Sequence, residues 1–303
     1  MTRERGAAVV LAMLIAALAA AVAVTVFAEQ QRWSRNVEHR RDQVQAQALV
    51  VAGVQWARQI LDDDARRSSI DHLGEPWAMS LPPIPIENGE IRGAIVDAQG
   101  RLNINGLGDA GVPGEQTRAR LARLFAQRNG PAGALDALAD WIDADGVVRE
   151  AGAEDAYYAA QPVPGLAANA PAVRVAELAS VKGVTPQTLF AVDPFISALP
   201  TGTPVNVNTA SPEVLAAIVG NLTAERLATL VAGRARNPFP SVAEFRARLP
   251  EGAVLASESG LSVQSSFFYV TVTATQGATQ ARARALLWRT GSAWPAVVWQ
   301  IVE

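Results

Sequence analysis

The sequence has no cysteine, only two histidines and few aromatic residues among its 303 positions. Without cysteine the protein forms no disulfide, offers no thiol nucleophile and supplies no sulfur ligand to zinc. His39 and His72 are far apart in the sequence, which argues against a histidine zinc site, and without cysteine the protein has no Cys–His catalysis. An exported domain of this size folds without disulfides, and a bound metal ion is then one cross-link that remains available.

Net charge is also small. The protein carries −3 at neutral pH, and removal of residues 1–6, with two arginines and one glutamate, leaves −4. Nucleic-acid binders usually carry a basic patch or a high isoelectric point. The composition therefore argues against a partner made of DNA or RNA.

A long apolar run, by contrast, is present near the N-terminus. Residues 7–28 carry no charge, and Thr25 is their only polar side chain. A membrane-spanning helix needs about 20 apolar residues, and a helix satisfies its own backbone hydrogen bonds in lipid. The run predicts a transmembrane segment at 7–28, and the composition after Arg32 predicts a water-exposed body.

The six residues before this run, Met1–Gly6, form a short basic leader. A secretory signal has a shorter apolar core followed by an A-x-A-like site, and no such site follows cleanly here. The leader resembles that of type IV prepilins, which a membrane peptidase cuts after glycine before the new N-terminus is methylated. This resemblance implies cleavage after Gly6 and methylation of Ala7, with an uncleaved signal-anchor as the alternative. Arginines flank the run on both sides, so the charge rule is not clean, and the leader favours a periplasmic body.

The hydrophobic pattern changes its period along the sequence. Helical spacing continues to about residue 62 and predicts one helix over 7–62, about 84 Å long, with Val50, Val54, Ala57 and Leu61 on one apolar face. Residues 108–255 have the pattern of helices and loops, with helices at 115–127 and 133–142. Alternating residues predict strands at 90–97, 101–105, 266–275, 280–290 and 294–302. We therefore expect an α+β fold in which the long helix packs on one antiparallel sheet.

Acidic residues gather after the helix at 133–142. Asp143, Asp145 and Glu154 stand at positions 1, 3 and 12 of an EF-hand-like loop, but Val147 and Val148 occupy positions 5 and 6, so the loop is not an EF-hand. Hard cations take carboxylate and carbonyl oxygens, which makes another kind of calcium loop one interpretation. Helix capping and exposure to water is the other. Paired carboxylates also serve glycosidases, but no aromatic sugar platform accompanies them.

A second motif lies further along the sequence. Asn206–Ala210 (NVNTA), followed by a turn at Gly220–Thr223, resembles the helix-hairpin-helix of competence-type DNA-binding proteins. The hairpin lacks the second glycine that such proteins use to present backbone N–H groups to phosphate, and few arginines lie nearby. We interpret the motif as architectural and keep a membrane-anchored DNA receptor as the alternative function.

Three features together resemble the minor pseudopilin K family of type II secretion systems. Most type IV pilins and pseudopilins carry glutamate at the fifth mature position, where this sequence has Leu11, and absence of that glutamate is a feature of the K family. The segment DAQGRLNING resembles the hairpin by which this family enters an inserted helical domain, and DWIDAD with GAEDAYY resembles its calcium-binding stretch.

The resemblance implies a type IV pilin-like fold with a large all-α domain, similar to sterile-alpha-motif and helix-hairpin-helix folds, inserted between strands. Leader 1–6, transmembrane segment 7–28, body 29–107 and 256–303, and insert 108–255 are the expected parts. Calcium is the implied cofactor, and its expected ligands are Asp143, Asp145, Glu154 and Asp155, with Asp140 as a supporting group.

By the same resemblance the protein is a non-enzymatic tip subunit of the type II secretion pseudopilus that helps to start its assembly for the export of folded proteins. It would lie in the inner membrane as a single-pass protein with its C-terminal domain in the periplasm. Expected partners are minor pseudopilins I and J, the prepilin peptidase, the assembly platform and the membrane, with no nucleic acid. A hydrolase ranks third, since no Ser/His/Asp or metal-hydrolase motif is present.

Overall fold

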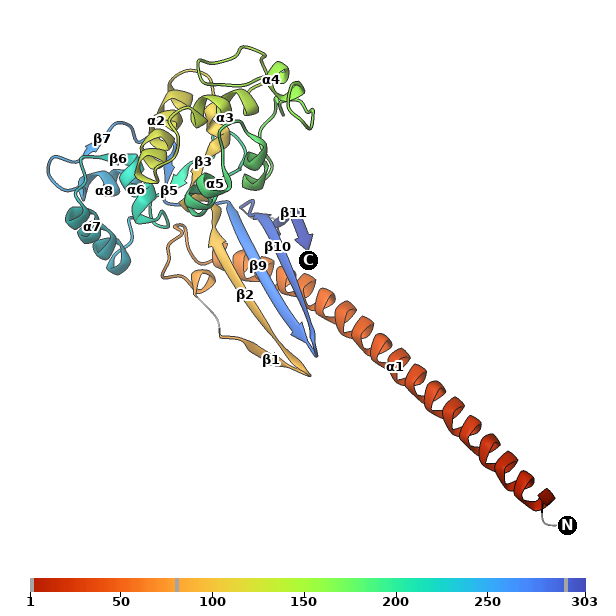
Figure 1. Ribbon diagram of the computed structural model, residues 1–303. Coiled ribbons are helices and arrows are strands. Elements are labelled where there is room, and N and C mark those ends of the chain that lie inside the picture. Colours follow the sequence, from red (N-terminus) through yellow and green to blue (C-terminus); the bar gives the residue numbers. More distant parts are fainter. Residues whose placement is uncertain (1–2, 80–81, 292–293) are drawn as a thin grey trace.

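A single long helix dominates the structure, a computed structural model that describes residues 3–79, 82–291 and 294–303 (Figure 1). Helix α1 (Arg3–Ala65) has 63 residues, which corresponds to about 95 Å. It runs through the backbone of Gly6 and Ala7, while Met1 and Thr2 of the expected leader lie outside the described residues. The predicted helix over 7–62 is confirmed. Its apolar part is long enough to cross a membrane, and its side chains from Val9 to Val26 are exposed.

The sheet explains why α1 stops being exposed in its second half. Five antiparallel strands follow the order β1-β2-β9-β10-β11. Their bounds are Ile84–Ile86, Gly89–Asp97, Phe267–Gln276, Thr279–Trp288 and Ala296–Val302. Along β9 every second side chain is buried, as expected for a strand with one face on a core. The strands predicted at 90–97, 266–275, 280–290 and 294–302 are therefore confirmed.

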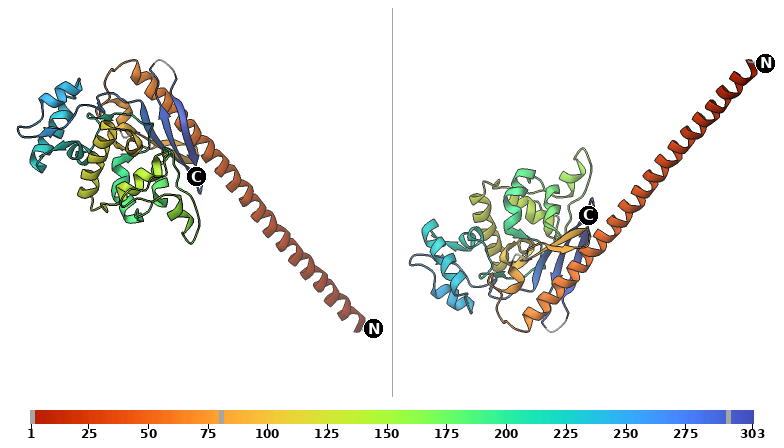
Figure 2. Two further views of the ribbon diagram at one scale, coloured as in Figure 1. Left: turned by 90° about the horizontal axis from the view of Figure 1, so that it is seen from above. Right: turned by 90° about the horizontal axis from the view of Figure 1, so that it is seen from below.

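Helix α1 lies along one face of this sheet, as Figures 1 and 2 show. Val50, Val54 and Leu61 are fully buried in a core that β9 completes with Phe268, Val270 and Val272. Burial of each such side chain contributes about 1.5–3 kcal/mol. The close approach is possible because α1 carries Gly53, where a Cβ atom would stand 2.6 Å from a methyl group of Val272.

The strand predicted at 101–105 forms over two residues only and does not join this sheet, so its predicted place in the sheet was wrong. The carboxylate of Asp97 accepts a hydrogen bond from the backbone N–H of Gln99 and begins a 3-10 turn, η2 (Ala98–Gly100), that redirects the backbone. The short strand β3 (Leu102–Asn103) then pairs in parallel with β4 (Ile196–Ser197). Leu102 and Ile104 are buried in the core of the helical region instead of against α1.

The region between β2 and β9 has mainly helices as its regular secondary structure and lies beyond the sheet, on the side away from the N-terminus of α1 (Figures 1 and 2). Leu121, Leu124 and Phe125 are buried in its core, as predicted. Its principal helices are α2 (Val112–Gln127), α3 (Ala134–Ile142), α4 (Asp155–Ala159), α5 (Pro186–Val192), α6 (Pro212–Ile218), α7 (Ala224–Arg236) and α8 (Val242–Ala247). The 3-10 turns η1 (Pro76–Ala78), η3 (Ile104–Gly108), η4 (Val175–Ser180) and η5 (Asp193–Phe195) complete the helical elements of the described residues.

Short strand pairs tie this region together. Strand β5 (Val205–Asn206) pairs in parallel with β8 (Leu261–Ser262), and β6 (Val219–Gly220) pairs with β7 (Val254–Leu255). The expected fold class is confirmed: a pilin-like helix and antiparallel sheet with a helical region placed between strands in the sequence. The region is helical but contains these small ladders.

Candidate functional site

Three of the four predicted ligands meet in the loop between α3 and α4. Asp143, Asp145 and Glu154 each place a carboxylate oxygen within 4.8 Å of the others. Asp143 directly follows the end of α3, and Glu154 directly precedes the start of α4. The loop therefore closes on itself and brings both of its ends to one point.

Three carboxylate oxygens of this group are buried without a hydrogen-bond partner among the described residues. Two belong to Glu154, which is only 5% exposed, and the third is Oδ1 of Asp143. Burial raises the pKa of Glu154, and the nearby charges of Asp140, Asp143, Asp145 and Asp155 raise it further. A buried carboxylate without a partner is costly, and a hard cation would satisfy all three oxygens, so the residues fit a calcium ion.

Asp140 supports the loop and does not belong to the group of three. Its side chain is fully buried and accepts hydrogen bonds from the backbone N–H of Arg149, at 3.1 Å, and from its guanidinium, at 2.6 Å. The same guanidinium donates to Oδ2 of Asp143 at 2.5 Å, while Oδ1 accepts no hydrogen bond from the described residues. Gly152 is required beside it, because a Cβ atom there would stand 1.8 Å from Oδ2 of Asp140.

Asp155, the fourth predicted ligand, is not brought into the group. Its Oδ1 atom accepts a hydrogen bond from the backbone N–H of Ala167 at 2.9 Å, which secures the following loop.

Lys182 contacts Gly152 in the loop between α3 and α4 and Tyr157 in α4. Its ammonium donates to the carbonyl oxygen of Gly152 at 2.8 Å and lies over the ring of Tyr157.

The second motif forms the expected hairpin between α6 and α7. Asn221 has a positive φ of 59° at the turn, and the side chains of Ser211 and Thr223 cap the two helices. A cation near it is used internally. The guanidinium of Arg234 is buried and donates to the carbonyl oxygens of Val207 and Ala210.

The asparagines of the same motif are also structural. Asn208 exchanges hydrogen bonds with the backbone of Phe239, and Asn206 donates from its amide to Oγ of Ser265 at 2.9 Å. Both side chains are buried, at 1% and 0% exposed. This motif therefore packs the helical region against the end of the sheet, and its buried arginine is not available to a phosphate.

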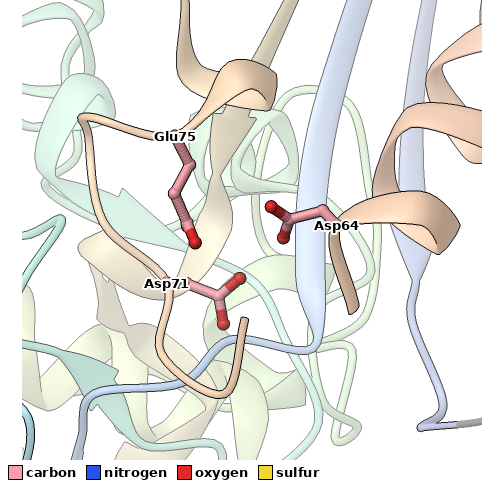
Figure 3. Close-up of side chains that lie close together, drawn as sticks. All are labelled: Asp64, Asp71 and Glu75. Carbon is pink, nitrogen blue, oxygen red and sulfur yellow. The ribbon is translucent and has the colours of Figure 1, made fainter. Parts of the chain in front are cut away.

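The structure reveals a second acidic cluster that sequence reasoning missed. Figure 3 shows Asp64, Asp71 and Glu75 converging at the end of α1. This cluster has an internal cation, because the guanidinium of Arg289 donates to Asp64 at 2.8 Å and also to Asp71. Glu75 accepts from the indole N–H of Trp77 at 2.8 Å.

Asp97 extends this polar network to the helical region. It accepts hydrogen bonds from the hydroxyl groups of Thr209, at 2.5 Å, and Ser265, at 2.6 Å. Burial raises the pKa of Asp97 to about 6, against hydrogen bonds that lower it. Burial and the charge of Glu75 raise the pKa of Asp64 to about 6. No local motif indicates this network, since its members come from distant segments, as Asp64 and Arg289 do with 225 positions between them.

Comparison with known proteins assigns the family. Two family models described as type II secretion system (T2SS), protein K match residues 100–201 and 205–264. Type II secretion system protein K of Pseudomonas aeruginosa is 32% identical over 88% of this chain and 83% of its own length. The protein of that name from Klebsiella pneumoniae is 30% identical over 95% of this chain and 94% of its own length.

A solved structure has the same fold. The crystal structure of the GspK-GspI-GspJ complex from the enterotoxigenic Escherichia coli type 2 secretion system contains a polypeptide that matches with a TM-score of 0.78 and 23% identity. The match spans 88% of the present protein and 99% of that one. The long exposed helix, the pilin-like sheet, the helical region and these matches lead to one conclusion: the protein belongs to the protein K family of the type II secretion system.

Proposed function

We propose that this protein is a minor pseudopilin that caps the tip of the type II secretion pseudopilus and helps to start its assembly. One observation carries the proposal. The helical region lies beyond the end of the sheet that is remote from the N-terminus of α1 (Figures 1 and 2). In a filament of pilin-like subunits, we expect the next subunit to stack above this end. This helical region, called the head from here on, is large enough to leave no room for that subunit.

The membrane half of α1 supports the same role. From Val9 to Val26 the helix exposes apolar side chains on every side, so it needs lipid or neighbouring helices around it. Leu11 stands where most pilin subunits carry a glutamate, and a carboxylate in lipid is expensive. In the pilin family that glutamate is thought to face the N-terminal amine of the neighbouring subunit during stacking, and a cap has no such neighbour above it.

The proposed partners follow from the family and from the solved relative, which lies in a complex with GspI and GspJ. We propose that this protein binds minor pseudopilins I and J through α1 and the head, and that it is processed by the prepilin peptidase and inserted by the assembly platform. It would be held in the inner membrane with its C-terminal head in the periplasm. Its action is steric and associative, without catalysis.

Co-purification tests the assembly. Tagged full-length protein, extracted from membranes that also contain pseudopilins I and J, is expected to bring down both partners in equal amounts. Mass spectrometry of the same sample is expected to find Ala7 as a methylated N-terminus. An intact Met1 end, or recovery of the protein without either partner, contradicts the proposal.

Calcium is the proposed cofactor of the loop between α3 and α4. Asp143, Asp145 and Glu154 would supply carboxylate oxygens, and the ion would fasten the two ends of the loop. The support is the trio of converging acids with three buried oxygens that accept no hydrogen bond from the described residues. Its role is structural, to hold a loop of the head in one conformation.

A further inference from the structure

A cleft of about 210 Å³ opens on the helical region, apart from the acidic loop. It lies where η3, the first turns of α2, the segment at 202–205 and the segment at 259–260 meet. Three of its lining residues are glycines, which place no side chain in the cleft: Gly106, Gly202 and Gly260. The cleft is bordered by polar groups from segments that are distant in the sequence.

Arg120 lines this cleft, and its guanidinium group has few partners within the protein. The residue is 9% exposed, and its guanidinium donates to one carbonyl oxygen, that of Ser259, at 2.8 Å. Among residues 3–79, 82–291 and 294–303, no carboxylate forms an ion pair with it. Burial lowers the pKa of Arg120, and the neighbouring charge of Arg123 lowers it further. Arginine nevertheless keeps its proton in proteins, so a positive charge is held here without a counter-ion from the described residues.

Two other buried arginines have more acceptors within the protein than Arg120 has. Arg289, also 9% exposed, has the carboxylates of Asp64 and Asp71 as partners. Arg234 lacks a carboxylate among the residues described, but it directs one nitrogen at two carbonyl oxygens, at 2.6 and 2.8 Å. Arg120 alone of these three has a single protein acceptor, although Arg234 also borders an open pocket. Buried charges in proteins are usually paired, which makes an anion from outside the protein the expected partner.

The rest of the lining restricts the kind of anion. Asp109 lines the same cleft, and no ion pair of its carboxylate is found among the described residues. Its negative charge disfavours free, multiply charged anions such as phosphate, and it offers an acceptor to N–H groups. Thr117 and Thr203 also line the cleft, and their hydroxyl groups donate to the carbonyl oxygens of Pro113 and Pro200. A guanidinium fork matches the two oxygens of a carboxylate, and a backbone carrying N–H donors matches Asp109.

We propose that this cleft binds a carboxylate carried by a polypeptide segment, held by the guanidinium of Arg120 while Asp109 accepts N–H groups of the same segment. The carboxylate is either the C-terminus of a protein or an acidic side chain. This site goes beyond the proposed cap role and does not depend on it, since it concerns what the head contacts and not where the subunit sits in the filament.

Three matched peptides test the proposal on the full-length protein in detergent. One is an N-acetylated neutral hexapeptide with a free C-terminus, the second is its C-terminal amide, and the third is the amide with one glutamate. Isothermal titration calorimetry at one ionic strength is expected to detect the first, the third or both, and not the second. Binding of the first alone identifies a C-terminal carboxylate as the ligand, and binding of the third alone identifies an acidic side chain.

Variants connect the binding to the cleft. R120Q is expected to raise the Kd at least tenfold. R120K keeps the positive charge but loses the planar guanidinium, and its Kd is expected to be intermediate. R284Q removes an exposed arginine of β10 that pairs with Glu303 on the sheet, outside the cleft, and is the matched control, with an unchanged Kd. Q116W places a large side chain at the cleft from the first half of α2 and is expected to block binding if R120Q does not fold. Equal binding of all three peptides, no binding of any, or full binding by R120Q (by Q116W, if R120Q does not fold) would overturn the proposal.

Discussion

Substitution of Glu154 by glutamine is the sharpest test of the acidic loop, because it should lower the Tm when calcium is bound and should not lower it when calcium is removed. With calcium at about 100 times its Kd, binding adds about 2.7 kcal/mol to the free energy of unfolding. At roughly 2–4 °C for each kcal/mol in a protein of this size, a chelator should lower the Tm of the wild type by about 5–10 °C. E154Q removes one of three carboxylates and should lose most of that response.

The ion-free proteins should show the opposite order. In the absence of a cation, Glu154 is a buried carboxylate that accepts no hydrogen bond from the described residues and is surrounded by the charges of Asp140, Asp143 and Asp145. Glutamine removes that repulsion, so E154Q with chelator should have a Tm equal to or above that of the wild type with chelator.

The assay is thermal unfolding of the full-length protein in detergent, followed by near-ultraviolet circular dichroism with calcium or with chelator. Glu150 is an exposed residue of the same loop, and E150Q should respond to chelator as the wild type does. The calcium proposal is refuted if the wild type shows no shift, or if E154Q and the wild type shift equally.

Two further predictions concern the residues that hold the loop and the sheet in place. Gly152→Ala should cost about 1–3 kcal/mol in urea unfolding because its methyl group would collide with Oδ2 of Asp140, whereas Gly146→Ala, with open space around it, should cost much less; equal costs would contradict this packing. Asp97, with a pKa raised to about 6 from 3.8, binds its proton more tightly in the folded protein, so its contribution to stability is present below pH 4 and is lost as the pH rises through 6. The difference in unfolding free energy between the wild type and D97N should therefore change by roughly 2 kcal/mol between pH 4 and pH 7, and a constant difference would contradict the assigned burial.

Local periodicity predicts the parts of this fold whose cause is local. The 3–4 spacing of Val50, Val54 and Leu61 identifies the packed face of α1, and alternation identifies β9 and β10. The turn after β2 was misassigned because a hydrogen bond from Gln99 to Asp97 redirects the backbone there, and hydrophobic alternation carries no signal for it.

The acidic loop was predictable for a similar reason. Asp143, Asp145 and Glu154 lie within twelve residues, so their spacing in sequence constrains their spacing in the structure. Asp155 follows Glu154 directly, but it begins α4 and its carboxylate faces the loop at Ala167. A sequence spacing does not reveal that difference in direction.

Polar contacts between distant segments could not be predicted from the sequence. Arg289 meets Asp64 across 225 positions, and Asp97 meets Thr209 across 112. The lack of a counter-ion for Arg120 among the described residues is equally invisible in the sequence, because it depends on which carboxylates the fold brings near. Only a three-dimensional arrangement shows that one arginine is paired and another is not.

The position of this subunit in assembled pseudopili tests the cap role most directly. Fibres assembled with a functional, tagged copy of the protein can be labelled with gold-conjugated antibody and imaged by electron microscopy. The head that lies above the sheet predicts one label per fibre, at one end only. Labels spaced repeatedly along the shaft would contradict the account.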